Sequence, residues 1–161
     1  MVDKEKILLA VEYFEKAYRL HISGDVNQAI KAYRKSIDYY PTPKAHNFLG
    51  WALSLIGKYE EAIEECKNAL ELDPNFGNAY NDIGIYLTNL NKFDDSIYWF
   101  QKAIKTPNYE SKYISMYNLG RVFEKKGMWF TALKYYSDSI QENPEYQPAK
   151  IAYHKLLAQL N

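Results

Sequence analysis

The chain has 161 residues, and its 20 Lys and Arg balance its 20 Asp and Glu, so the formal net charge is zero. This balance argues against a nucleic-acid partner and against an anionic membrane surface, because both attract a basic excess. Hydrophobic residues make up 47% of the chain. No segment approaches the roughly 18 consecutive apolar residues of a membrane span, so we expect one folded domain over 1–161.

The single cysteine, Cys66, excludes an internal disulfide and favours a reducing compartment. The first residues, MVDKEKILLAVEYFEK, carry charges throughout and lack the apolar run of a secretory signal. Together these features predict a cytoplasmic protein. Cys66 also stands where the helical pattern favours a medium-sized apolar residue, so we expect a buried structural thiol.

Apolar residues recur at helical spacing along the whole chain, as in Leu49, Leu53 and Ile56. Proline cannot continue a helix, so Pro41, Pro74 and Pro144 are expected to follow helix ends. On this basis we predict nine helices, at residues 3–22, 26–39, 43–56, 59–72, 77–90, 93–105, 110–126, 129–142 and 146–160.

The sequence repeats itself. The turn residues Gly24, Gly57, Asn91 and Gly127 are spaced by 33, 34 and 36 residues. Within the repeats, the segments HNFLGWAL, YNDIGIYL and MYNLGRVF share a central glycine, followed at fixed steps by a small residue and an apolar residue and then by a proline, which comes one residue early at Pro107. A fixed period of this length is typical of solenoid proteins.

This pattern resembles the tetratricopeptide repeat, with its signature W-x2-L-G-x2-Y, then A-x3-F, then P, over about 34 residues. The first unit matches less well, since Ala17 stands in place of the glycine. The resemblance implies an all-α, right-handed superhelical solenoid of about four helical hairpins in one domain. The expected repeats cover 10–42, 43–76, 77–112 and 113–146, and a capping helix covers 147–160.

Glycine inside a helix costs about 1 kcal/mol relative to alanine, yet Gly50, Gly84 and Gly120 all stand mid-helix. We expect each to lie where the two helices of one hairpin touch. The small residues twelve positions later, such as Ala62 and Ser96, are the expected contacts on the second helix.

Signs of catalysis are lacking. The sequence contains neither a phosphate-binding G-x-x-x-x-G-K-[ST] loop nor a G-x-G-x-x-G, G-x-S-x-G or H-E-x-x-H motif. His21, His46 and His154 are scattered rather than spaced as metal ligands. We therefore predict a protein that is not an enzyme, with no cofactor and no metal. The aromatic run Tyr98–Phe100 is interpreted as core between repeats.

In the family that the sequence resembles, the first helices of the hairpins line a concave face that binds a protein or peptide. Residues three before and one after each central glycine share one face of their helix. These positions and their neighbours are rich in aromatic and amide side chains, which suit a peptide groove. The candidate binding residues are Phe14, Tyr18, Lys44, Asn47, Trp51, Asn78, Asn81, Ile85, Tyr117, Asn118 and Arg121.

Two alternatives concern these candidates. Asn47, Asn81 and Asn118 either bind a peptide backbone, as in some family members, or bond to a neighbouring hairpin. The aromatic side chains of the first repeats either face a ligand or are covered by the N-terminal segment or by a second copy of the chain. The alternative function is therefore a self-associating protein, a possible homo-oligomer, or a structural subunit of a larger assembly, in which the groove is occupied internally.

Some family members clamp the acidic C-terminal tails of heat-shock chaperones with five residues, including a cationic pair that binds a carboxylate. In one alignment this chain supplies Phe14, Tyr18, Phe48, Asn78 and Asp82 at these positions. In the next alignment it supplies Asn47, Trp51, Asp82, Ile114 and Asn118. Neither set holds the cationic pair, and Asp82 would repel a carboxylate, so we predict no such clamp. Arg121 beside Lys125 favours, at most, an acidic group at one end.

Overall fold

A computed structural model of the chain describes residues 3–160. This part of the chain folds into nine α-helices and contains no β-strand. Every predicted helix is present, and each boundary lies within two residues of the predicted one. The helices are α1 (Lys4–Ile22), α2 (Val26–Tyr39), α3 (Pro43–Leu55), α4 (Tyr59–Leu72), α5 (Gly77–Asn89), α6 (Phe93–Lys105), α7 (Lys112–Lys125), α8 (Trp129–Glu142) and α9 (Gln147–Leu160).

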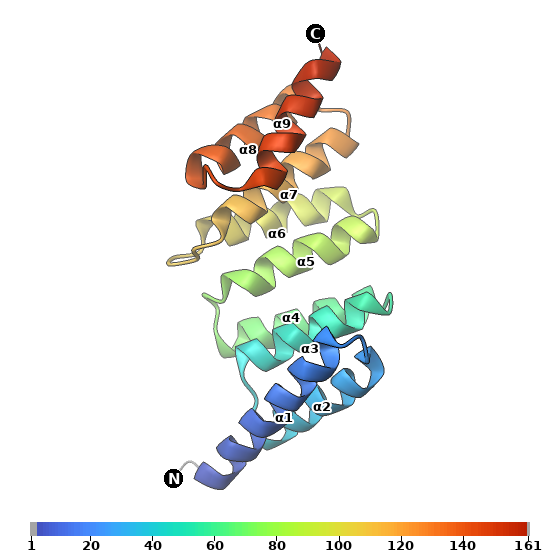
Figure 1. The fold of residues 1–161 in the computed structure, drawn as a ribbon. Helices are drawn as coiled ribbons and strands as arrows, with labels where there is room; N and C mark the ends of the chain where they lie inside the picture. Colours follow the sequence, from blue (N-terminus) through green and yellow to red (C-terminus); the bar gives the residue numbers. More distant parts are fainter. Residues whose placement is uncertain (1–2, 161) are drawn as a thin grey trace.

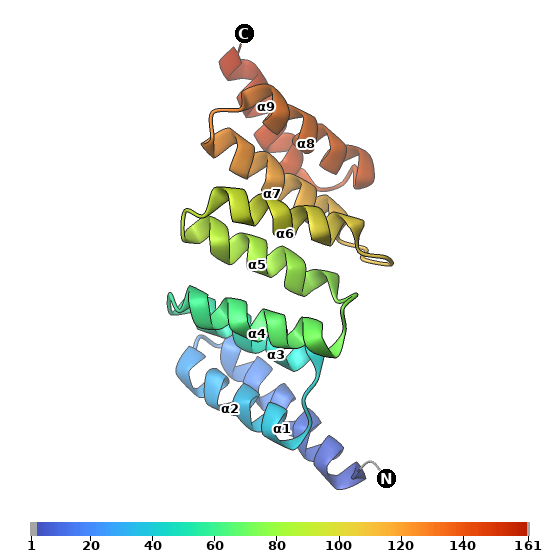
Figure 2. The same cartoon turned by 180° about the vertical axis from the view of Figure 1, so that it is seen from behind.

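Consecutive helices pair into hairpins that stack in chain order. Within the hairpins α1 packs on α2, α3 on α4, α5 on α6 and α7 on α8, while α9 packs against α8. Figure 1 views the stack with α1, α3 and α5 in front, and Figure 2 shows α2, α4 and α6 from behind. The two ends of the chain lie at opposite ends of the stack, so this is a helical solenoid rather than a closed bundle.

The turn inside each hairpin requires a left-handed backbone. Gly24, Gly57 and Gly127 have φ values of 88°, 77° and 72°, and Asn91 has a φ of 59°. Glycine adopts this region without steric cost, and asparagine tolerates it better than most residues. The four turn residues that define the repeat in the sequence therefore have one shared backbone conformation.

The central glycines lie against the second helix of their hairpin, as predicted. A Cβ atom on Gly84 would lie 2.6 Å from the ring of Phe100, and one on Gly120 would clash with the ring of Tyr136. At Gly50 the nearest atom to an added Cβ is the carbonyl oxygen of the small residue Ala62, at 3.0 Å. In the last two hairpins the nearest atoms belong to an aromatic ring, one helical turn beyond the small residue, and the glycine makes room for it.

The residue at this position of the second helix is part of the buried core in every hairpin. Tyr33, Cys66, Phe100 and Tyr136 occupy the same position in successive repeats and are all almost fully buried. Burial raises the pKa of the Cys66 thiol, which matches the prediction of a structural cysteine rather than a reactive one. Between residues 3 and 160, no helix has both the length and the hydropathy to cross a membrane.

The prediction for the aromatic run Tyr98–Phe100 was wrong at its first residue. Phe100 is buried, but the Tyr98 side chain is 54% exposed. Trp99 is partly buried and stacks on Tyr80, with 5.9 Å between ring centroids. Successive residues of a helix point about 100° apart, so three in a row cannot all face one core.

Candidate functional site

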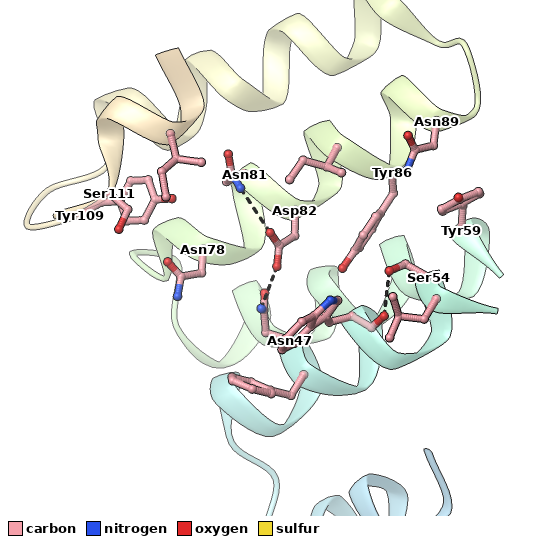
Figure 3. Close-up of a pocket in the computed structure, with 15 residues that line it drawn as sticks. Asn47, Ser54, Tyr59, Asn78, Asn81, Asp82, Tyr86, Asn89, Tyr109 and Ser111 are labelled. Carbon is pink, nitrogen blue, oxygen red and sulfur yellow. Dashed lines mark hydrogen bonds between the residues drawn. The ribbon is translucent and has the colours of Figure 1, made fainter. Parts of the chain in front are cut away.

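A groove of about 580 Å³ opens between α3, α5 and the start of α7. Figure 3 shows it in close-up. We call it the central groove. Its walls come mainly from α3 and α5, with one residue from α4, two from the segment that leads into α7 and one from α7 itself. The lining residues are Asn47, Phe48, Trp51, Ser54, Leu55, Tyr59, Asn78, Asn81, Asp82, Ile85, Tyr86, Asn89, Tyr109, Ser111 and Ile114.

Helix geometry explains which side chains reach the groove. Asn47 and Trp51 lie four residues apart on α3, and Asn81 and Ile85 lie four apart on α5, so each pair shares one helix face. Both pairs have the same offsets from their central glycine. The Trp51 side chain is 42% exposed in this wall, and the neighbouring Leu55 is also exposed. The groove therefore offers accessible apolar area.

Asp82 lies in the centre of the groove between two amide side chains (Figure 3). Its Oδ2 accepts a hydrogen bond of 2.9 Å from Nδ2 of Asn47, and its Oδ1 accepts one of 3.2 Å from Nδ2 of Asn81. Asn47 belongs to α3 and Asn81 to α5. The carboxylate therefore connects two successive hairpins.

The same network extends to the next hairpin. Oδ1 of Asn81 accepts hydrogen bonds from Oγ of Ser115, at 2.9 Å, and from Nδ2 of Asn118, at 3.2 Å. We call the five residues Asn47, Asp82, Asn81, Ser115 and Asn118 the polar bridge. It crosses α3, α5 and α7, and hydrogen bonds among buried polar groups fix the geometry of the elements that carry them.

The three candidate asparagines are thus bonded within the protein. Asn47, Asn81 and Asn118 are 6%, 6% and 8% exposed. Bonding to a neighbouring hairpin, one of the two alternatives drawn from the sequence, is what the structure shows. Peptide binding by these three amides stays a prediction. The exposed amides of the groove are those of Asn78 and Asn89.

Asp82 is a site residue that the sequence reasoning missed, having considered it only as repelling a carboxylate. Burial raises the pKa of its carboxyl group from 3.8 to about 6, against the opposing effect of the hydrogen bonds from Asn47 and Asn81. A signal was present in the sequence. The residue two before the central glycine is Phe48 in the second repeat and Asn118 in the fourth, but an acid in the third.

The N-terminal candidates lie beside the central groove in an aromatic cluster. Phe14 packs edge-on against Phe48, at 5.3 Å between ring centroids, and Tyr18 does so at 5.9 Å. The ammonium group of Lys44 lies 5.1 Å above the centre of the Phe14 ring. Phe48 and Trp51, whose rings are 5.7 Å apart, join this cluster to the groove.

His21 forms the buried base of the same cluster. It is 5% exposed, its ring lies 4.2 Å from that of Trp51, and its Nδ1 is 3.2 Å from the hydroxyl of Tyr33. Burial lowers the pKa of His21. The buried imidazole therefore packs directly against the indole of Trp51.

The other two C-terminal candidates, Tyr117 and Arg121, do not line the central groove. Tyr117 packs on Tyr136, at 5.8 Å between centroids, and the Arg121 guanidinium lies 5.8 Å above the Tyr117 ring. Arg121 also lines a separate hollow of about 400 Å³ with Glu124, Lys125, Trp129 and Gln159. The structure therefore brings five candidates together in the central groove: Asn47, Trp51, Asn78, Asn81 and Ile85.

Comparison with known families agrees with this architecture. Models of the tetratricopeptide repeat match residues 9–43, 43–76, 77–106 and 115–146. The chain belongs to the tetratricopeptide repeat family. Over 82 residues, which are half of this chain, the sequence is 33% identical to the small glutamine-rich tetratricopeptide repeat-containing protein 2 of Mycosarcoma maydis. The matched region covers 23% of that protein. The chain thus spans less than a quarter of this relative.

Solved structures show the same fold. The structure of pilF of Pseudomonas aeruginosa superposes on 96% of this tetratricopeptide repeat chain with a TM-score of 0.87 and 20% identity, and the match covers 70% of pilF. YrrB, described as a TPR protein with an unusual peptide-binding site, superposes on 89% of the chain and 73% of YrrB, with a TM-score of 0.73 and 19% identity. At such low identity these likenesses establish the fold alone.

Proposed function

We propose that this tetratricopeptide repeat protein is a non-catalytic scaffold that binds a segment of a partner protein in the central groove. The observation that carries the proposal is the groove itself, which crosses successive hairpins and exposes Trp51 and Leu55 beside the amides of Asn78 and Asn89. Apolar walls supply contact area, and exposed amides can bond to a peptide backbone. The description of YrrB as having a peptide-binding site supports the same use of this fold.

Rigidity favours such binding. The polar bridge holds α3, α5 and α7 in fixed positions through hydrogen bonds of 2.9–3.2 Å. The rings of His21 and Phe48 both pack against the indole of Trp51. A binding surface that is already ordered leaves the entropy loss of binding largely to the partner segment.

Replacing Trp51 with alanine tests the proposal. Peptides selected from a random phage-displayed library on the wild-type protein are expected to bind Trp51→Ala at least about tenfold more weakly, because truncating an aromatic hot-spot residue of an interface typically costs about 2 kcal/mol or more. Fluorescence anisotropy with labelled peptides measures the dissociation constants. Circular dichroism verifies that the variant is folded.

Phe130→Ala is the matched control. This side chain is 80% exposed at the start of α8 and does not line the central groove, so its removal should leave peptide affinity unchanged. Two outcomes would contradict the proposal: a library that yields no binding peptide, or peptides that lose equal affinity in both variants.

Self-association is the second candidate function, and exposed apolar residues on α1 favour it. Leu8, Val11 and Ile22 are 69%, 51% and 65% exposed. Val11 lines a hollow of about 390 Å³ with Ile7, Ala10 and Phe14. If this surface joins two copies, the sedimentation coefficient should rise with protein concentration, and Leu8→Glu should abolish the rise. A coefficient that does not change with concentration in the wild type would exclude this function.

A further inference from the structure

We propose that the central groove selects a partner segment that carries a Lys or Arg side chain, with Asp82 as the counter-ion. This inference rests on the proposed function, because it assumes that a peptide segment enters the groove. It adds the chemical class of that segment and the residue that recognises it.

The charge of the groove is the first argument. Asp82 is the only Asp, Glu, Lys, Arg or His among the fifteen lining residues. Across residues 3–160, the ion pairs of the protein all involve other acids. A partly buried carboxylate without an opposite charge is unfavourable, and a cationic group from outside would remove this cost.

The orientation of the carboxylate is the second argument. Asn47 holds one oxygen from α3 and Asn81 holds the other from α5, at 2.9 and 3.2 Å. A carboxylate offers about four acceptor positions, so these two bonds leave capacity on both oxygens. A guanidinium or ammonium group can therefore bond to a carboxylate whose position is already set.

The surroundings of Asp82 suit a cation with an aliphatic stem. Trp51, Ile85 and Tyr86 line the same groove. Lys and Arg bury their methylene groups along apolar surface, and an indole face attracts the charged end. A metal ion fits poorly, since the described residues contain no group of three or more His, Cys, Asp or Glu that would hold one.

Peptide selection provides the first test. The random phage-displayed library is applied separately to the wild type, to Asp82→Asn and to Asp38→Asn. Asp38 is an exposed acid on α2 outside the groove, so its variant makes the same chemical change elsewhere. We expect Lys or Arg to be enriched at one peptide position with the wild type and Asp38→Asn, and this enrichment to disappear with Asp82→Asn.

The outcomes separate this inference from the proposed function. If the wild type selects peptides without any basic preference, and Trp51→Ala still weakens their binding, the groove binds peptides but Asp82 does not select them. If the preference persists in Asp82→Asn, another acid is responsible and the inference is wrong. If the wild type selects no peptide, both proposals fail.

A measurement on the wild-type protein avoids any dependence on how well the variant folds. One selected peptide is synthesised with its basic residue changed to a neutral isostere, citrulline for Arg or norleucine for Lys. The change should weaken binding to the wild type about tenfold, as expected for a charge-assisted hydrogen bond. It should weaken binding to folded Asp82→Asn by less than about twofold. Equal affinity of both peptides for the wild type would overturn the inference.

Discussion

Replacing Gly84 with leucine is expected to lower the free energy of unfolding by about 3 kcal/mol, because it forces a side chain into a filled core. The first added carbon would already lie 2.6 Å from the ring of Phe100. That ring is 1% exposed and has no free space to enter, so α5 and α6 must separate. Urea denaturation followed by circular dichroism measures the effect.

A second substitution isolates the cause. Gly84→Leu combined with Phe100→Ala should be more stable than the sum of the two single effects predicts, since the leucine then fills space left by the ring. Coupling between two residues in contact is typically 0.5–3 kcal/mol. An unchanged denaturation midpoint in the single variant, or strict additivity in the double variant, would show that Gly84 does not determine how closely the hairpin packs.

Much of the fold was accessible from the sequence because each repeat carries its own boundary signals. Prolines follow helix ends, and the turn residues Gly24, Gly57, Asn91 and Gly127 adopt positive φ. These are local effects that act within a few residues, so they can be recognised without knowing the rest of the structure. The prediction that Tyr98 belongs to the core was wrong because it treated Tyr98–Phe100 as one unit. Successive side chains of a helix point about 100° apart, so three in a row cannot share one environment.

The candidate site was accessible only in part. Positions relative to the central glycine predict that Asn47, Trp51, Asn81 and Ile85 lie on one surface, because helix periodicity determines direction within a hairpin, and all four line the central groove. The hydrogen bonds that these side chains make could not be predicted from the sequence. Asn81 bonds to residues 34 and 37 positions away, and such distances depend on how one hairpin stacks on the next.

The importance of Asp82 was missed for a similar reason. A single carboxylate in a sequence with equal numbers of acids and bases is unremarkable. It becomes distinctive only when the other groove residues are known to be uncharged, and these come from three hairpins. Its role is thus a property of the assembled stack rather than of its own helix.

Replacing Asp82 with asparagine is expected to stabilise the free protein by about 2 kcal/mol near pH 7.5. Its pKa is raised from 3.8 to about 6 in the folded state, so between these pH values the folded protein binds the proton more tightly than the unfolded chain. The stability that this group contributes is complete below pH 3.8 and is lost as the pH rises through about 6. A neutral amide does not undergo this loss.

The polar bridge can accept the amide. Oδ1 of Asn81 is already occupied by Ser115 and Asn118, whereas Oδ1 of Asn47 receives only a weak bond of 3.8 Å from the Cys66 thiol. A rotation of the Asn47 amide would therefore let its oxygen accept from the new Nδ2, so that no donor is left facing another donor.

The measurement is the difference in unfolding free energy between Asp82→Asn and the wild type, taken at several pH values from 4 to 7.5. We expect this difference to be small at the acid end and to grow by about 2 kcal/mol across the titration of Asp82. Other carboxyl groups affect both proteins alike and cancel. Asp82 lies in the middle of a groove and is expected to lower the stability of the free protein at neutral pH. Binding of a cationic partner group would explain why a destabilising carboxylate is present there. A difference that stays constant with pH would show that the carboxylate is well solvated, and the need for a cationic partner would disappear with it.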